Sequence, residues 1–284
     1  MFKKTFAILA FSAIAASTGL FAQEAGKTLK IAVADPICRE SACSCVTGTL
    51  REYGETVKQI EKSSGLKLEL SYFEEEALLL RELKKGSFDG VIGKLSVFGV
   101  IFKDASRNFV RLADIAKPDG DAMLSGVFIV YKNASLKDLA SAKGKTFAFG
   151  QSDAPEKSQL AFETLKRLGI EVPKEDARQE HFSCKEGALA LIERKADVAV
   201  ISDYALQFGC IVVVGDPKDF SVIGRTDKAI PFTTFMVDSI KVSPENQKLL
   251  KKALLEVKGD SVPKELLSTG FVEPKPWPSD VVLP

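Results

Sequence analysis

The chain has 284 residues, of which 45% are hydrophobic and 27% are charged. This composition excludes a disordered or fibrous protein. Lys and Arg number 39 against 38 Asp and Glu, so no basic excess is available to neutralise the phosphates of a nucleic acid. Nucleic acid is therefore not expected as a partner.

Residues 1–22 have the layout of a secretory signal. Lys3 and Lys4 precede an apolar run from Phe6 to Ala16, and small residues then lead to Ala22. The run is too short to span a bilayer. The sequence thus predicts a periplasmic or secreted protein, working where thiols tend to be oxidised.

The first half of the remaining chain alternates strands with helices. Apolar residues recur at alternating or helical spacing, and the acidic first turn and basic last turn of one helix suit its dipole. The predicted elements are a strand at 29–34, a helix at 46–61, a strand at 66–72, a helix at 74–85, and strands at 88–93 and 109–115. This succession predicts a mostly parallel sheet with helices on both faces.

The second half repeats the scheme without repeating the sequence. The predicted elements are strands at 126–132 and 145–150, helices at 155–168 and 186–195, strands at 197–201, 211–214, 220–225 and 231–237, and a helix at 244–257. Ser243 caps this last helix and Pro244 occupies its first position.

The length predicts two lobes, because roughly 260 residues exceed one core of typical size. The strand at 126–132 carries the chain into a second lobe, and the strand at 231–237 returns it to the first. We therefore expect lobe I to comprise 27–125 and 230–284, and lobe II to comprise 126–229.

Several segments carry a family resemblance. They are Gly126–Lys132, Leu136–Leu139, Lys143–Gly150, Gly187–Val200 and Phe220–Arg225. With the secretory signal and the interrupted first lobe, they resemble the phosphate/phosphite/phosphonate-binding family of periplasmic substrate-binding proteins, which has the type 2 periplasmic binding fold. The resemblance implies two α/β lobes joined by crossover strands. It also implies a ligand enclosed between them and passed to a transporter permease or a sensor kinase.

The physics of such sheets is consistent with this function. Open α/β sheets bind ligands at their strand ends, where backbone N–H groups and helix dipoles favour anions. The expected walls are 35–45, 93–98, 150–156 and 202–204. The predicted function is capture of a small polar ligand, an oxyanion such as phosphonate or phosphite, by a monomer that serves an ABC-type transporter.

Three candidate ligand-binding residues come from the first lobe. Arg39 offers a bidentate fork and Lys94 a point charge to an anion. Ser96 offers a hydroxyl from the same region as Lys94. For either basic residue, a solvated surface position remains the alternative.

The segment from Gly150 to Pro155 lies between a strand and a helix, where the family places hydroxyls around the ligand. Ser152 matches that role. Asp153 and Glu156 depart from it, because carboxylates repel a phosphonate unless cations offset them. Ser152 and Asp153 have a second interpretation as plain helix caps.

Three further candidates lie in the second lobe. Asp203 and Tyr204 follow a buried strand, and Asp203 either pairs with a cationic group of the ligand or caps a turn. His181 is the only histidine. The family commonly has a histidine near this position that reaches the ligand, and the alternative is a surface imidazole.

The five cysteines are Cys38, Cys43, Cys45, Cys184 and Cys210. In an oxidising compartment disulfides are expected, for instance Cys38 with Cys43 or Cys45, and Cys184 with Cys210. Alternatively, the clustered thiols bind a soft metal or metalloid. The alternative function is therefore a thiol-based redox or soft-metal sensor on the same scaffold.

Enzyme signatures are missing from the sequence. It contains no Gly-x-Ser-x-Gly, His-Glu-x-x-His or phosphate-loop motif. A thiol nucleophile at Cys184, three residues after His181, is the remaining enzymatic interpretation. We predict no catalytic residue, no bound metal and no cofactor.

Overall fold

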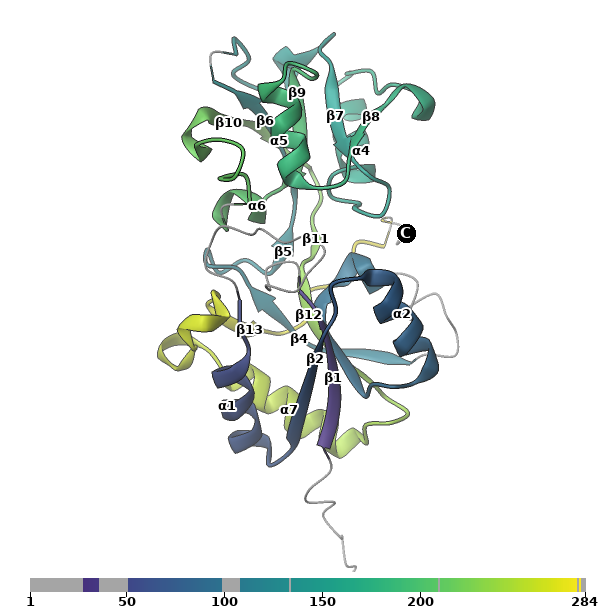
Figure 1. Cartoon of the computed structure of the whole chain (residues 1–284), viewed down its shortest axis with the longest axis vertical. Coiled ribbons are helices and arrows are strands. Elements are labelled where there is room, and N and C mark those ends of the chain that lie inside the picture. Colours follow the sequence, from purple (N-terminus) through teal and green to yellow (C-terminus); the bar gives the residue numbers. More distant parts are fainter. Residues whose placement is uncertain are drawn as a thin grey trace, which may run out of the picture.

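A computed structural model describes residues 28–35, 51–98, 108–132, 134–208, 210–279 and 281. Figure 1 shows two α/β units stacked along the long axis, with crossover segments between them. The predicted signal, Arg39, and the cysteines at 38, 43 and 45 lie outside the described residues. No helix in the described part of the chain has the length and apolar character needed to span a membrane.

The first unit is a six-stranded sheet in the order β13-β4-β12-β3-β1-β2. Its strands are β1 (Thr28–Ala34), β2 (Lys67–Tyr72), β3 (Gly90–Lys94), β4 (Phe109–Ala116), β12 (Thr233–Asp238) and β13 (Gly270–Val272). Its helices are α1 (Gly54–Ser64), α2 (Glu76–Lys85) and α7 (Pro244–Glu256).

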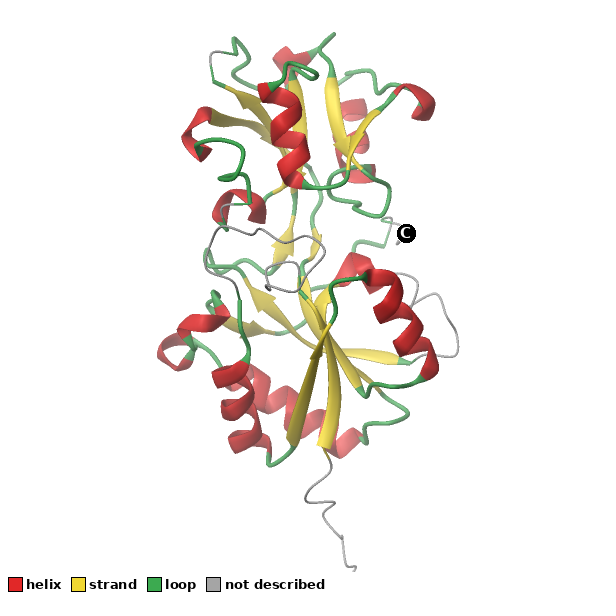
Figure 2. Ribbon diagram, in the orientation of Figure 1, coloured by secondary structure: helices red, strands yellow, loops and turns green. Residues whose placement is uncertain are grey.

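Helices cover both faces of this sheet, as Figure 2 shows. Alternate residues of β1 reach opposite faces. Ile31 packs in one core with Ile60 of α1 and Leu250 of α7, whereas Ala32 packs in another with Leu79 of α2. Burial on both faces explains why β1 contains so few polar residues.

The second unit is a five-stranded sheet in the order β10-β6-β9-β7-β8. Its strands are β6 (Gly126–Tyr131), β7 (Phe147–Gly150), β8 (Gln179–His181), β9 (Val198–Ser202) and β10 (Phe220–Arg225). Its helices are α4 (Gln159–Arg167), α5 (Cys184–Ile192) and α6 (Tyr204–Gln207). Val127 faces the core under α5, and Phe128 faces the core under α4.

Two crossover segments connect the units. Residues 117–125 run from β4 to β6, and residues 226–232 run from β10 to β12. Within them β5 (Met123–Leu124) pairs antiparallel with β11 (Ile230–Pro231), and Figure 1 places this pair between the two sheets. The short 3-10 helices are η1 (Leu95–Phe98), η2 (Ala140–Ala142), η3 (Glu175–Ala177), η4 (Pro217–Asp219), η5 (Gly259–Ser261) and η6 (Lys264–Leu266).

The predicted two-lobed α/β class is confirmed, but the prediction of mostly parallel sheets is wrong. β1 pairs parallel with β2 and β3, and β7 pairs parallel with β8 and β9. The remaining pairs in both sheets, which involve β4, β6, β10, β12 and β13, are antiparallel. The sheets are therefore mixed, because the strands next to the crossovers run against their neighbours.

Several predicted elements differ in the structure. Within the described residues, the helix expected at 46–61 begins at Gly54. The helix expected at 155–168 begins at Gln159, because residues 151–158 form turns. The strand expected at 211–214 is a turn in which the Val214 amide donates to the Ile211 carbonyl at 3.0 Å. Local hydrogen bonding thus overrides the β propensity of its valines.

Candidate functional site

Side chains from the two sheets meet at Lys94, the last residue of β3. Its Nζ lies 2.8 Å from Oε1 of Glu156, which belongs to the turn between β7 and α4. The Ser202 hydroxyl, at the end of β9, donates to the same oxygen at 2.7 Å. This ion pair therefore joins the six-stranded sheet to the five-stranded one.

Backbone contacts fix the position of the Glu156 turn. The Gly150 amide donates to the Lys157 carbonyl at 3.0 Å. At Gly126, the first residue of β6, an added Cβ would lie 2.0 Å from the Glu156 carbonyl oxygen. Only glycine allows this close approach of the turn to β6.

We expect Gly126→Ala to lower the free energy of unfolding by about 2–3 kcal/mol, because the methyl group would collide with backbone rather than with a movable side chain. Gly54→Ala is the matched control, since its added Cβ comes no closer than 3.8 Å to Glu265. Urea unfolding measures both changes, and equal stability of the two variants would contradict the packing described.

Glu156 is fully buried and carries a charge balanced by lysines. Burial acts to raise its pKa, but the charges of Lys94 and Lys157 outweigh burial and hold the pKa below its ordinary value. The side chain of Lys94 is 12% exposed. An ionised carboxylate is thus placed beside the Lys94 ammonium in a buried region, with the charge of Lys157 acting on it as well.

Several buried polar atoms around this pair lack a hydrogen-bond partner among the described residues. They are Ser96 Oγ, Thr233 Oγ1 and Glu156 Oε2. Thr233 lies directly opposite Lys94 in the β12–β3 ladder. Each unsatisfied buried group costs about 1–3 kcal/mol, so this region is suited to a polar bound molecule that supplies the missing contacts.

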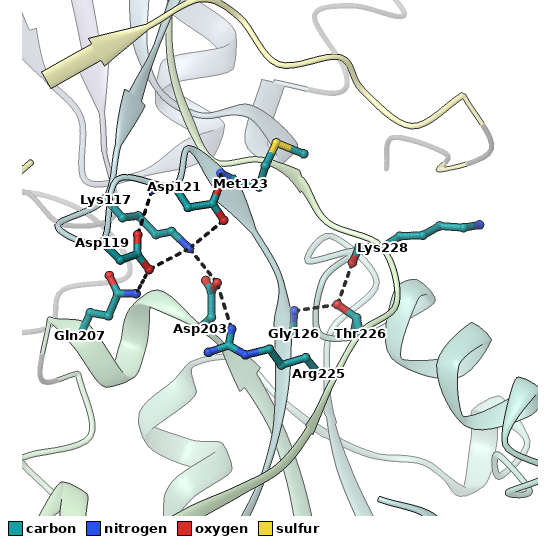
Figure 3. Close-up of polar contacts among 10 residues, drawn as sticks. All are labelled: Lys117, Asp119, Asp121, Met123, Gly126, Asp203, Gln207, Arg225, Thr226 and Lys228. Carbon is teal, nitrogen blue, oxygen red and sulfur yellow. Dashed lines mark hydrogen bonds and ion pairs between the residues drawn. The ribbon is translucent and has the colours of Figure 1, made fainter. Parts of the chain in front are cut away.

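A second cluster lies where the first crossover leaves β4 (Figure 3). Lys117 is 1% exposed, and its Nζ lies 2.7 Å from Asp203 Oδ2. Arg225 Nη1 lies 3.5 Å from the same oxygen. Asp119 and Asp121 flank the Lys117 ammonium at 4.0 and 3.8 Å. This cluster ties the crossover to β9 and β10.

Burial raises the pKa of Asp203 and outweighs the opposing charge of Lys117. Asp203 makes no side-chain capping bond to α6, so the predicted turn-capping role is wrong. Its carboxylate pairs within the chain with Lys117, and pairing with a cationic group of a ligand stays a prediction. Asp203 directly follows Ser202, the last residue of β9, so the two clusters are adjacent in sequence.

His181 and Tyr204 lie in the core of the second unit. His181 Nε2 lies 2.9 Å from the Val200 carbonyl, and an added Cβ on Gly187 would lie 2.8 Å from that nitrogen. Burial, and then the charge of Lys157, lower the pKa of His181 to about 4. The alternative of a surface imidazole is therefore wrong, and contact of His181 with a ligand stays a prediction. Tyr204 stacks on Phe232 with ring centroids 4.8 Å apart.

Ser152 and Asp153 are exposed in the turns that follow β7. The predicted capping role is wrong for both, because α4 begins only at Gln159, with Ser158 at its N-cap position. The structure thus brings Lys94 together with Glu156 and Ser202, and Asp203 together with Lys117 and Arg225. It leaves Ser152 and Asp153 on the surface.

The described cysteines do not pair with each other. Cys184 is a buried thiol whose sulfur accepts a hydrogen bond from the Ser202 amide at 3.4 Å. Cys210 is disulfide-bonded, so the predicted Cys184–Cys210 disulfide is wrong. Within the described ranges, no group of three or more His, Cys, Asp or Glu side chains is arranged to hold a metal ion.

Sequence reasoning missed part of this site. Lys117, Arg225 and Thr233 were not among the candidates, and Glu156 was noted only as a departure from the family pattern. The available signal was position, since Lys117 and Ser202 stand at the ends of buried strands. A charged residue at the end of such a strand is a good candidate for a crevice residue.

Comparison with known proteins agrees with this arrangement. A family model described as the periplasmic substrate-binding protein of a phosphonate ABC transporter matches residues 47–276. No curated protein matches the chain.

Among solved structures, a Xanthomonas citri protein bound to chloride ion has 18% identity and a TM-score of 0.61, covering 88% of this chain and 92% of its own. A binding protein of an ABC phosphonate transporter from Pseudomonas aeruginosa has 14% identity and a TM-score of 0.60. The match covers 87% of this chain and 81% of that protein. PhnD1 from Prochlorococcus marinus in complex with methylphosphonate has 13% identity and a TM-score of 0.59. The match covers 88% of this chain and 93% of that protein. At these identities, the likeness concerns the fold.

Proposed function

Since the chain belongs to the family of periplasmic substrate-binding proteins of phosphonate ABC transporters, we propose that it captures a small phosphorus oxyanion, such as a phosphonate or phosphite, between its two sheets. It then delivers this ligand, as a monomer, to the permease of an ABC-type transporter. Export by a signal at residues 1–22 fits this periplasmic role.

The observation that carries the proposal is the contact between the sheets at Lys94. An ammonium group supplies the charge for an anion, and the unpaired Ser96 and Thr233 hydroxyls supply hydrogen-bond donors. Lys94 also offsets Glu156, the carboxylate that would otherwise repel a phosphonate. The methylphosphonate carried by the Prochlorococcus marinus neighbour supports the same ligand class.

We extend the proposal to the lobes. Residues 27–125 and 230–284 form lobe I, and residues 126–229 form lobe II. The pairing of β5 with β11 supports this division, because it holds the two crossover segments side by side between the lobes. Closure of the lobes about these crossovers would bury the ligand, as in other hinged binding proteins.

No observation favours the soft-metal or redox sensor. In the described residues Cys184 is buried and Cys210 is disulfide-bonded, and Cys38, Cys43 and Cys45 lie outside those residues. We therefore do not propose it.

Calorimetric titration of the purified protein with methylphosphonate, phosphite and phosphate tests the proposal. We expect at least one to bind, and Lys94→Gln to weaken that binding by about 10- to 100-fold, because a charged hydrogen bond contributes about 1.5–3 kcal/mol. Lys58→Gln is the control, since Lys58 is 71% exposed and pairs with Glu55 on the surface of α1. Failure of all three compounds to bind, or unchanged binding by Lys94→Gln, would overturn the proposal.

A further inference from the structure

The two oxygens of Glu156 have different surroundings. Oε1 accepts from Lys94 at 2.8 Å and from Ser202 at 2.7 Å. Oε2 has no hydrogen-bond partner among the described residues, and the side chain is completely buried. One oxygen is therefore saturated by the protein, while the other retains its full capacity to accept.

An ionised carboxylate can accept hydrogen bonds but cannot donate them. The pKa of Glu156 lies below its ordinary value, so the carboxylate is charged at neutral pH. A fully deprotonated oxyanion placed against Oε2 would set lone pairs against lone pairs, at a large cost in a buried site. A ligand that presents an O–H to Oε2 instead gains a charge-assisted hydrogen bond.

The other groups around Glu156 do not remove this requirement. Lys94 and the Ser202 hydroxyl donate to Oε1, and the unpaired hydroxyls of Ser96 and Thr233 are able to donate to the oxygens of a bound anion. Donors are thus available for an oxyanion, whereas Glu156 Oε2 requires a donor from the ligand.

We propose that Glu156 determines specificity: its Oε2 accepts a hydrogen bond from a P–OH group, so the protein selects singly protonated phosphorus oxyanions over anions without an acidic proton. This inference rests on the proposed function and assigns the role of one residue within it. A sulfonate, which has the same shape and charge as a phosphonate monoanion but no O–H, should be rejected.

Two lysines act on the charge of Glu156. They are Lys94 on β3 and Lys157 in the same turn. On β8, His181 faces Lys157, and its pKa of about 4 keeps it neutral. Asp203, directly after β9, is paired with Lys117. Because His181 is already neutral near pH 7, a change in affinity in that range reports on the ligand's own proton.

The test compares methylphosphonate with methanesulfonate by calorimetry, at a pH below the second ionisation of methylphosphonate. We expect methylphosphonate to bind at least about 100-fold more tightly, and its affinity to fall as the pH rises through that ionisation. In Glu156→Gln, whose amide can turn an N–H toward the ligand, we expect the preference to fall below about 10-fold. Glu163→Gln, which alters a half-exposed partner of Lys228, should keep the wild-type preference.

The outcomes separate the two claims. Equal affinity of the wild-type protein for the two anions, or a preference that Glu156→Gln leaves intact, overturns the role of Glu156 while the proposed function stands. Binding of neither anion, nor of phosphite or phosphate, overturns the proposed function itself. The wild-type comparison decides the question even if Glu156→Gln does not fold.

Discussion

Replacing Lys117 with methionine is expected to lower the free energy of unfolding by about 3–5 kcal/mol, because it leaves Asp203 buried without its cation. The Lys117 ammonium lies 2.7 Å from Asp203, and both side chains are at most 3% exposed. Arg225, at 3.5 Å and 56% exposed, is too distant and too solvated to replace it. Urea unfolding at neutral pH measures the loss.

Two further variants test whether the loss comes from the unpaired charge. The double variant Lys117→Met with Asp203→Leu should regain most of the stability, since well-packed apolar residues often replace a buried ion pair at little cost. The loss in Lys117→Met should also shrink at acidic pH, where Asp203 is protonated, because burial already raises its pKa. A loss independent of pH and unrelieved in the double variant would show that packing, not charge, is responsible.

Lowering the pH from 7 to 4 is expected to cost the wild-type protein about 3 kcal/mol through His181 alone. The pKa of this residue falls from 6.5 to about 4, because burial and then Lys157 disfavour the imidazolium. Between pH 6.5 and 4, His181 therefore binds a proton in the unfolded chain but not in the folded chain. This contribution to stability is complete above pH 6.5, falls between 6.5 and 4, and is lost below 4.

The comparison variant is His181→Gln, with His181→Asn as a second choice if the first is poorly folded. Urea unfolding at several pH values between 7 and 4 gives the slope of stability against pH for each protein. Carboxyl groups contribute equally to all of them, so the difference in slope isolates His181. Parallel curves for wild type and variant would contradict a buried neutral imidazole.

The sequence was sufficient to predict the α/β class, because apolar residues recur at one spacing in strands and at another in amphipathic helices. The residues of β1 alternate between two cores, and those of α7 recur at helical spacing. The prediction of a strand at 211–214 is wrong, because there the residue preferences disagree with the backbone that the chain adopts. Its valines favour a strand, but the chain turns there through the contact between Ile211 and Val214.

The candidate site was only partly predictable. Lys94 was recognised as a cation at a strand end, but its partner Glu156 lies 62 residues away and on the other sheet. Lys117 and Asp203 are 86 residues apart. Such pairs depend on how the sheets pack, which no local pattern encodes. The burial of His181 is likewise a tertiary effect, since it depends on the absence of a side chain at Gly187.

A crystal structure of the protein grown with methylphosphonate tests the location of binding most directly. We expect the phosphonate between the sheets, within hydrogen-bond distance of Lys94 and with one oxygen against Glu156 Oε2. Two results would contradict binding at this site. One is ligand density elsewhere on the molecule, and the other is no ligand density beside Lys94 and Glu156 at a saturating ligand concentration.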